Sequence, residues 1–280
     1  MSGKISYENY HQASLMAKDI DPSILCLKYI ADRYELNLEQ RYWIAYLYGC
    51  TYCAPTVFYI YNEFPDYRNA DISRMERWWN KNKNKTIFQT DRQRIKSNNQ
   101  FIPSVISYRA LCGANQRNYF IDSSWKKIYT KILRIKYFGR FSLFNYLDVL
   151  NAITDIDAQP TYLNMLEAES CRNGIAFSEE RLDLMNHSNG KKLSGMDLKF
   201  FHQKFKEYLR KYEGNVFQIE TTLCAYKKYR LGKRYVGYYI DRMYNEIELI
   251  SERVTDGVYW DVLWEFREET FDKKYLEECQ

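Results

Sequence analysis

The sequence predicts an all-α fold, on three observations. Apolar residues recur at steps of three and four in one segment after another, which is the spacing of one face of a helix. No segment shows a convincing alternation of apolar and polar residues, so strands are not expected. The sequence also lacks a Walker loop, a GxGxxG loop and an internal repeat. With 280 residues, the chain can bury one substantial core. We expect a single helical domain over residues 1–280, and an arrangement in two lobes, 1–120 and 121–280, is open.

The first helices are marked by prolines and by buried faces. Pro22 stands at the start of a predicted helix, and Ile24, Leu27 and Ile30 follow it at helical spacing. The segment from Leu38 is apolar nearly all round, which predicts a central helix. Pro55 starts another helix, which ends before Pro65.

Two cysteines at the end of the predicted central helix, Cys50 and Cys53, form a CxxC motif. A zinc site needs two further ligands, and a thioredoxin-like role needs a preceding strand, neither of which the sequence offers. We interpret the pair as buried thiols. The chain has seven cysteines, no signal-peptide run and no uninterrupted apolar stretch of membrane-spanning length. We therefore expect a protein with reduced thiols in the cytoplasm and without a membrane partner.

The middle of the chain carries basic and aromatic residues that suit nucleic acid. Residues 74–97 combine arginines and tryptophans with a run of alternating Asn and Lys. The next helix, from Trp125, has an apolar stripe opposite Lys127, Lys131 and Arg134, which could contact the DNA backbone. A solvated basic face is the alternative. Gly139 ends this helix, and Ser142 is expected to cap the one that follows.

The overall composition leaves a nucleic-acid partner undecided. The net charge of +5 is too mild to establish one. Tyrosine is unusually frequent, with 27 residues, and its ring suits both protein cores and stacking on bases. An AT-rich coding bias would also enrich tyrosine.

In the second half, glycines and serines mark the ends of helices. A helix over residues 162–174 is expected to stop at Gly174. A loop covers residues 186–195, and Ser194 with Asp197 forms a start of the capping-box type. Asp256-Gly257 predicts a turn before the last helix.

The stretch from Val216 to Arg242 is the best candidate for chemistry. Read as a helix, it places Glu220, Cys224 and Lys227 on one face beside an apolar stripe. Gly232 is a plausible left-handed stop, and a second helix follows. Ionisable groups at the buried edge of two helices are costly unless they are paired or used. The alternative to a chemical role is a structural one, in which these groups form an ion pair that closes a helical hairpin.

Several of these segments together resemble a known family. They are Glu39-Gln-Arg-Tyr-Trp-Ile, Thr90-Asp-Arg, Phe138-Gly-Arg-Phe-Ser, Glu169-Ser-Cys-Arg-Asn-Gly-Ile, Glu220-Thr-Thr-Leu-Cys-Ala-Tyr-Lys-Lys and Arg234-Tyr-Val-Gly-Tyr-Tyr-Ile-Asp-Arg. In this order they are similar to the alpha-glutamyl/putrescinyl thymine pyrophosphorylases, or amino acid:DNA transferases, of DNA-hypermodifying bacteriophages.

The resemblance implies a fold, a reaction and partners. The fold would be related to helix-hairpin-helix DNA glycosylases, without an iron–sulfur centre because no spaced set of four cysteines is present. The reaction would occur on double-stranded phage DNA, at a 5-hydroxymethyluracil that a phage kinase has activated with phosphate or pyrophosphate. The amine of an amino acid or polyamine would displace that group, in the host cytoplasm. No metal site or cofactor is legible, although pyrophosphate could bring Mg²⁺.

The reaction needs groups that the sequence can supply. Glu220 or Asp241 could accept the proton of the amine. Cys224, if Lys227 lowers its pKa, could add to C6 of the ring. An extruded base would stack on aromatic rings, for which Tyr235, Tyr239 and Trp43 are candidates. The departing pyrophosphate needs cations, for which the candidates are Arg92, Arg94, Arg140, Arg172, Arg234 and Arg242.

Two readings compete with the transferase. One is a non-catalytic DNA-binding protein on the same scaffold, and the other is a base-excision glycosylase. The sequence leaves open the amine, the leaving group, the target sequence and the oligomeric state.

Overall fold

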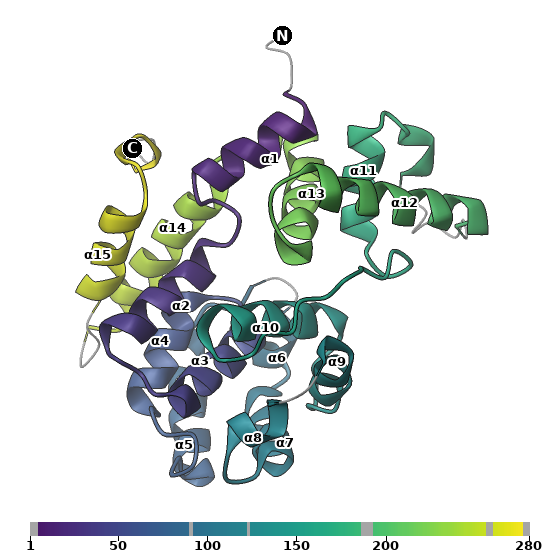
Figure 1. Cartoon of the computed structure of the whole chain (residues 1–280). Helices are drawn as coiled ribbons and strands as arrows, with labels where there is room; N and C mark the ends of the chain where they lie inside the picture. Colours follow the sequence, from purple (N-terminus) through teal and green to yellow (C-terminus); the bar gives the residue numbers. More distant parts are fainter. Residues whose placement is uncertain (1–4, 90–91, 122–123, 186–192, 256–259, 277–280) are drawn as a thin grey trace. The chain divides into compact units, whose positions relative to one another are not determined.

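The regular elements of this protein are helices. The computed structural model describes residues 5–89, 92–121, 124–185, 193–255 and 260–276, and within these ranges no strand is present (Figure 1). The all-α prediction is thus confirmed, while the closer likeness to helix-hairpin-helix glycosylases stays a prediction.

The chain divides into two compact units, each built from separate segments. The first unit comprises Met1–Pro22, Gln159–Asp241 and Phe271–Gln280, and the second comprises Ser23–Ala158 and Arg242–Thr270. These bounds differ from the lobes 1–120 and 121–280, because each unit includes segments from both halves of the sequence.

The first unit holds the following helices: α1 (Tyr7–Met16), α11 (Glu169–Ser178), η3 (Leu182–Leu184), α12 (Gly195–Lys211), α13 (Val216–Arg230) and η4 (Lys273–Tyr275). The second unit holds α2 (Pro22–Arg33, its first residue belonging to the first unit), α3 (Leu38–Thr51), α4 (Ala54–Glu63), α5 (Ile72–Asn82), η1 (Lys83–Lys85), α6 (Gln93–Ser97), α7 (Phe101–Cys112), α8 (Gln116–Phe120), α9 (Trp125–Leu133), α10 (Arg140–Ile153) and α15 (Asp261–Thr270). Helix α14 (Tyr238–Arg253) begins in the first unit and continues in the second.

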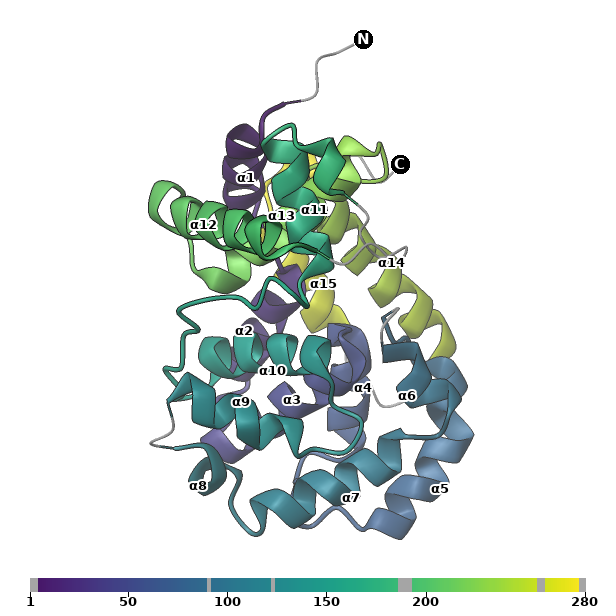
Figure 2. The same cartoon turned by 90° about the vertical axis from the view of Figure 1, so that its right-hand side faces the viewer.

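Helix α3 is the centre of the second unit. Every residue from Tyr42 to Thr51 is buried, as the apolar character of this segment predicted. The helix packs against α4, α8 and α10 (Figure 2). Asn37 and Gln40 form a capping box at its start, which satisfies backbone N–H groups that have no partner inside the helix.

Tyrosines build much of this core. The ring of Tyr46 stacks on that of Tyr108 with centroids 3.9 Å apart, and the Tyr46 hydroxyl donates to Ser104 Oγ at 2.8 Å. The hydroxyls of Tyr108 and Tyr146 lie 2.9 Å from each other. Each of these rings therefore contributes apolar area while its hydroxyl keeps a hydrogen bond, which a buried polar group requires. These tyrosines are structural and are not available to stack on a base.

In the first unit, α11 crosses α13 at a very close approach (Figure 1). A Cβ atom added to Gly174 would lie 2.2 Å from the carbonyl oxygen of Leu223. The prediction that Gly174 ends a helix is wrong, because Gly174 lies inside α11 and provides room for the backbone of α13. Glu169 begins the helix, so the predicted start at 162 is also wrong.

Helix α1 is fixed to α13 by polar groups in the interior. His11 is fully buried, its Nδ1 lies 2.9 Å from Thr222 Oγ1, and its Nε2 lies 2.7 Å from the carbonyl oxygen of Glu213. The Tyr7 hydroxyl lies 2.9 Å from the same Thr222 hydroxyl. This network connects the N-terminal helix to the helix that carries the predicted catalytic residues.

Several predicted helix starts and stops are confirmed, but Gly139 does not end α9, which already ends at Leu133. Helix α2 begins at Pro22, α4 has Pro55 in its first turn, and Ser194 with Asp197 forms the capping box of α12. Gly232 follows α13 with φ +71°. Ser142 does not cap α10, because the helix already begins at Arg140 with Gly139 as its N-cap, and Ser142 is buried in its first turn.

Some predictions concern residues that the structure does not describe. The Asp256-Gly257 turn, most of the loop over residues 186–195, and Thr90 and Asp91 of the Thr-Asp-Arg segment lie outside the described residues. Within the described residues, no helix is both long enough and apolar enough to cross a lipid bilayer. None of the six described cysteines, Cys50 and Cys53 included, forms a disulfide, and five of them are buried.

Candidate functional site

Helix α13 presents the predicted acid, thiol and amine on one side. Asn215 and Gln218 cap its start, with Asn215 Oδ1 accepting from the Gln218 N–H at 3.0 Å. Ile219, Leu223 and Tyr226 face the core and are almost completely buried. Glu220, Cys224 and Lys227 are partly exposed, as expected for residues beside an apolar stripe.

The surroundings of Cys224 contain most of the charged groups that the sequence suggested. Burial raises the pKa of the Cys224 thiol, and the nearby Glu220 carboxylate raises it further. Arg234, a hydrogen bond with Ser170 and Lys227 act in the opposite direction and do not reverse the shift. The structure thus brings Glu220, Lys227 and Arg234 close to one thiol. It does not give the lowered thiol pKa that the covalent hypothesis requires.

Arg234 is held by aromatic rings in the turn between α13 and α14. Its guanidinium carbon lies 4.9 Å from the centroid of the Tyr238 ring and 4.6 Å from that of the Tyr239 ring. It also donates a hydrogen bond to the Tyr239 hydroxyl. Nearby, the exposed Tyr235 donates to the Asp241 carboxylate. The Tyr235 ring is partly exposed and meets the edge of the Tyr238 ring, with centroids 5.9 Å apart, whereas the ring of Tyr239 contacts a cation.

Asp19 is a member of this site that sequence reasoning missed. Its carboxylate is buried and accepts from the backbone N–H groups of Gly237 at 2.8 Å, Tyr239 at 2.8 Å and Ile240 at 3.1 Å. It therefore caps α14 from a distant part of the chain. Burial raises the pKa of Asp19 to about 7, although the three N–H donors act to lower it.

In the second unit, Arg242 takes part in a buried ion pair. Its Nε lies 2.7 Å from Oε1 of Glu246, and Gln89 donates to the same carboxylate oxygen. Burial raises the pKa of Glu246, and Arg242 counteracts this shift. The Arg242 guanidinium also lies 5.6 Å from the centroid of the Tyr52 ring. The observed contacts of Arg242 are structural, and its predicted role in binding phosphate stays a prediction.

The remaining arginines of the second unit differ in exposure. Arg92 is 2% exposed, so it is part of the interior. Arg94 is exposed, and its Nη2 lies 3.6 Å from the position that a Cβ on Gly139 would occupy. Arg140 is the first residue of α10, whose N-cap makes no side-chain hydrogen bond. The structure thus brings Arg94 to the start of the helix that carries Arg140, a place where backbone N–H groups favour anions.

Two predicted site residues are buried and make contacts inside the protein, and their predicted roles stay predictions. Trp43 is 1% exposed, stacks on Tyr46 and donates from Nε1 to the carbonyl oxygen of Phe64 at 2.8 Å. No face of its ring is open to a base in this conformation, so the structure does not support stacking at this position. Arg172 is 8% exposed and donates through Nη1 to the carbonyl oxygens of Met165 and, at 2.8 Å, Leu166. Its guanidinium fixes the loop before α11.

The basic face of α9 is only partly free. Lys127 and Arg134 are exposed. Lys131 donates to the carbonyl oxygen of Tyr119, and its Nζ lies 5.3 Å from the centroid of that ring. Lys127 and Arg134 therefore remain the better candidates for contacts with DNA phosphates.

No metal centre is found in the described part of the chain. Among these residues, no three or more His, Cys, Asp or Glu side chains are grouped so that they could hold a metal ion.

Comparison with known proteins identifies the family. Residues 18–235 match the family model of the amino acid:DNA transferases. The chain is 30% identical to a serinyltransferase of Salmonella phage ViI, over 82% of this chain and 63% of the relative. The chain thus spans less than two thirds of the length of that curated relative. The matched residues include the whole of α11 and α13 and the turn with Arg234. The chain belongs to the amino acid:DNA transferase family.

Proposed function

We propose that this protein transfers an amino acid, through its amino nitrogen, to an activated 5-hydroxymethyluracil in double-stranded phage DNA. The family supports amino acid transfer to DNA, and the related serinyltransferase makes serine the first amino acid to test. The reaction forms a bond between the amine nitrogen and the methylene carbon at C5. It breaks the bond between that carbon and the phosphate or pyrophosphate oxygen.

The observation that carries the proposal is the grouping of Glu220, Lys227 and Arg234 around Cys224. A base must leave the helical stack before its C5 substituent can react, and the exposed Tyr235 offers a ring for it. Arg234 supplies positive charge for the departing phosphate oxygens. Glu220 or Asp241 accepts the proton that the amine must lose.

Direct displacement fits the site better than a covalent intermediate. A cysteine that attacks C6 must be a thiolate, but burial and Glu220 raise the pKa of Cys224. In direct displacement, Cys224 needs no charge, and its protonated thiol serves only to fill space on this side of α13.

DNA is held by groups outside this cluster. Arg94 beside the start of α10, together with Arg140, supplies a phosphate contact, and Lys127 and Arg134 supply others along α9. The activated base must come from an enzyme that phosphorylates 5-hydroxymethyluracil, and a base kinase is therefore the reaction partner. The protein itself needs no cofactor in this scheme, although Mg²⁺ can accompany pyrophosphate.

The test is a transfer assay with DNA that contains phosphorylated or pyrophosphorylated 5-hydroxymethyluracil. The full chain is incubated with this DNA and an amino acid, and the digested nucleosides are analysed by mass. We expect a nucleoside that carries the amino acid, and a rate that falls about 100-fold or more in Glu220→Gln. Glu252→Gln, at an exposed position on α14, is the matched control. Binding without product would favour the non-catalytic DNA-binding protein, and release of free base would favour the glycosylase.

A further inference from the structure

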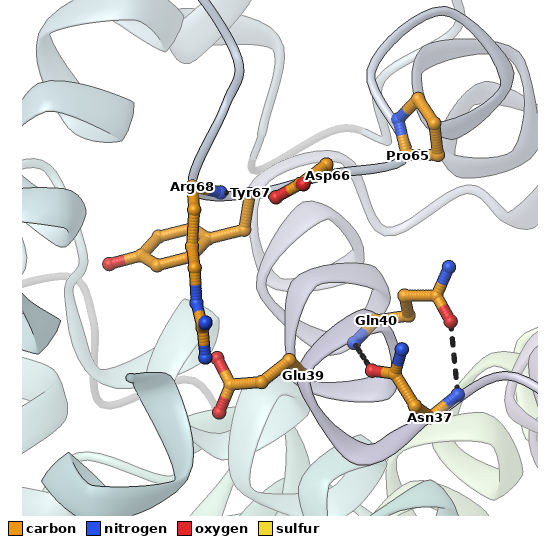
Figure 3. A pocket seen from close by; sticks show the side chains of 7 residues that line it. All are labelled: Asn37, Glu39, Gln40, Pro65, Asp66, Tyr67 and Arg68. Atoms are coloured by element: carbon orange, nitrogen blue, oxygen red, sulfur yellow. Dashed lines mark hydrogen bonds between the residues drawn. The ribbon is translucent and has the colours of Figure 1, made fainter. Parts of the chain in front are cut away.

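The second unit contains a pocket that the reaction scheme has not used. It lies where α3 begins and where the chain turns after α4, and its volume is about 270 Å³. Figure 3 shows its lining side chains, which are Asn37, Glu39, Gln40, Pro65, Asp66, Tyr67 and Arg68. Pockets for drug-sized ligands measure about 300–1,000 Å³. This pocket therefore suits a smaller ligand.

Two carboxylates on its wall are held in place by backbone groups. Glu39 accepts from the N–H of Gln116 at 2.9 Å and from that of Arg117 at 3.0 Å, so it caps α8. Asp66 accepts from the N–H of Arg68 at 2.7 Å. Burial acts to raise the pKa of Asp66, but its hydrogen bonds outweigh this and hold the pKa below its ordinary range. Asp66 is therefore a fixed negative charge at neutral pH.

The same wall carries hydrogen-bond donors. The capping box of α3 uses the side-chain oxygens of Asn37 and Gln40, whose partners lie at 3.1 and 3.0 Å. Their amide –NH₂ groups remain as donors. Arg68 is exposed and extends its guanidinium toward the Glu39 carboxylate (Figure 3). Among the described residues, no hydrogen bond or ion pair engages this guanidinium, whereas the neighbouring Arg109 donates to the carbonyl oxygens of Arg68 and Ala70.

The two kinds of charge select a class of ligand. A phosphate would meet two carboxylates, and a polyamine would meet a guanidinium, so each would be repelled by part of the wall. A small zwitterion satisfies both kinds of group, since its carboxylate can take two parallel hydrogen bonds from a guanidinium and its ammonium can donate to carboxylates.

We propose that this pocket binds a free α-amino acid, with Arg68 on its carboxylate and Glu39 and Asp66 on its ammonium group. The inference rests on the proposed function, in which an amino acid is the donor, and it assigns a pocket that captures the free zwitterion before its amine is deprotonated for transfer.

Calorimetric titration of the full chain with glycine, L-serine and L-glutamate, in the absence of DNA, tests the pocket. At least one of these should bind, and Arg68→Ala should weaken that binding about 10- to 100-fold, the range for hydrogen bonds to charged groups. For serine, ethanolamine lacks the carboxylate and glycerate lacks the ammonium group, and both should bind more weakly. Lys28→Ala removes an equal charge from an exposed position on α2 and should bind like wild type. The proposal is overturned if no amino acid binds, or if Arg68→Ala binds as tightly as wild type.

The transfer assay separates this inference from the proposed function. We expect Arg68→Ala to raise the KM for the amino acid in proportion to its loss of affinity in the calorimetric titration. An unchanged KM in an active enzyme would refute the pocket and leave the transferase intact. If the amino acid binds in a way that depends on Arg68 but no transfer to DNA occurs, the proposed transferase function is refuted and the proposed amino-acid pocket is retained. Circular dichroism and thermal melting confirm that the variant is folded, as an exposed side chain predicts.

Discussion

Replacing Gly174 by alanine tests the contact on which the candidate site is built. Helix α11 meets α13 at Leu223, one residue before Cys224. An added Cβ would lie 2.2 Å from the Leu223 carbonyl oxygen, 2.7 Å from its carbonyl carbon and 3.0 Å from its Cα. All three are backbone atoms, so no side-chain rotation can relieve the clash. The two helices must move apart.

The cost has two opposing parts. Overpacking a well-packed interior costs typically about 1–3 kcal/mol, and backbone contacts place this substitution toward the upper end. Alanine is favoured over glycine inside a helix by about 1 kcal/mol. We therefore expect a net loss of roughly 1–2 kcal/mol, which lowers the Tm by about 2–8 °C in a protein of this size. The displacement also moves α13 relative to Ser170, so we expect transfer to fall together with stability.

Thermal and urea unfolding of Gly174→Ala, with a transfer assay on the folded fraction, measure both effects. Gly195→Ala is the matched control, because Gly195 lies in the first turn of α12 and a Cβ there would meet no atom within 4 Å. The control should melt at or slightly above the wild-type temperature. A Gly174→Ala protein that melts and transfers like wild type would show that α11 and α13 do not pack as closely as described.

Three further predictions concern charge. Burial raises the pKa of Asp19 from 3.8 to about 7, so between about pH 4 and pH 7 the folded state holds a proton that the unfolded state has lost. The free energy of unfolding of the wild type should therefore fall as the pH rises through this window. Urea unfolding of Asp19→Asn should show no such fall. If the two proteins have the same pH profile, the raised pKa of Asp19 is contradicted. Cys224→Ser should keep turnover within a few-fold of wild type, because burial keeps the thiol protonated, and a loss above about 100-fold would restore the covalent route. Lys127→Ala and Arg134→Ala should each reduce the slope of log K for DNA binding against log salt by about 1, whereas Lys131→Ala should change it less, since its amine is bound to Tyr119.

The sequence predicted those parts of the fold that depend on local chemistry. Pro22 and the Ser194–Asp197 box start helices because they satisfy or avoid unpaired N–H groups in the first turn, wherever the helix later packs. Gly174 shows where this reasoning fails. A glycine near the end of a helical pattern is typical of a stop, but the same lack of a side chain also permits two backbones to approach. Only the position of a second helix shows whether such a glycine ends its own helix or makes room for a neighbouring backbone.

The predicted site residues also divide into those whose position depends on local sequence and those whose position depends on distant parts of the chain. Helical spacing was sufficient to place Glu220, Cys224 and Lys227 on one face, because that face is a property of α13 alone. Whether an arginine is available to a ligand depends on carbonyl groups and rings elsewhere in the chain. Arg172 donates to the loop before its own helix, while Arg94 remains exposed. Trp43 lies in the part of α3, Tyr42 to Thr51, in which every residue is buried, and such burial favours packing over contact with a base.

Asp19 marks the limit of reading a site from local sequence. Its partners begin 218 residues further along the chain, at Gly237, which has φ +103°. The carboxylate binds the first N–H groups of α14, where a negative charge is stabilised by the helix dipole, and so fixes the turn that carries Arg234. A residue at position 19 would be assigned to the start of α2 on sequence alone, because Asp21-Pro22 follows it. The structure instead shows Asp19 capping the start of α14. If Arg234 acts as proposed, Asp19→Asn should slow transfer through the position of this turn, which the transfer assay measures.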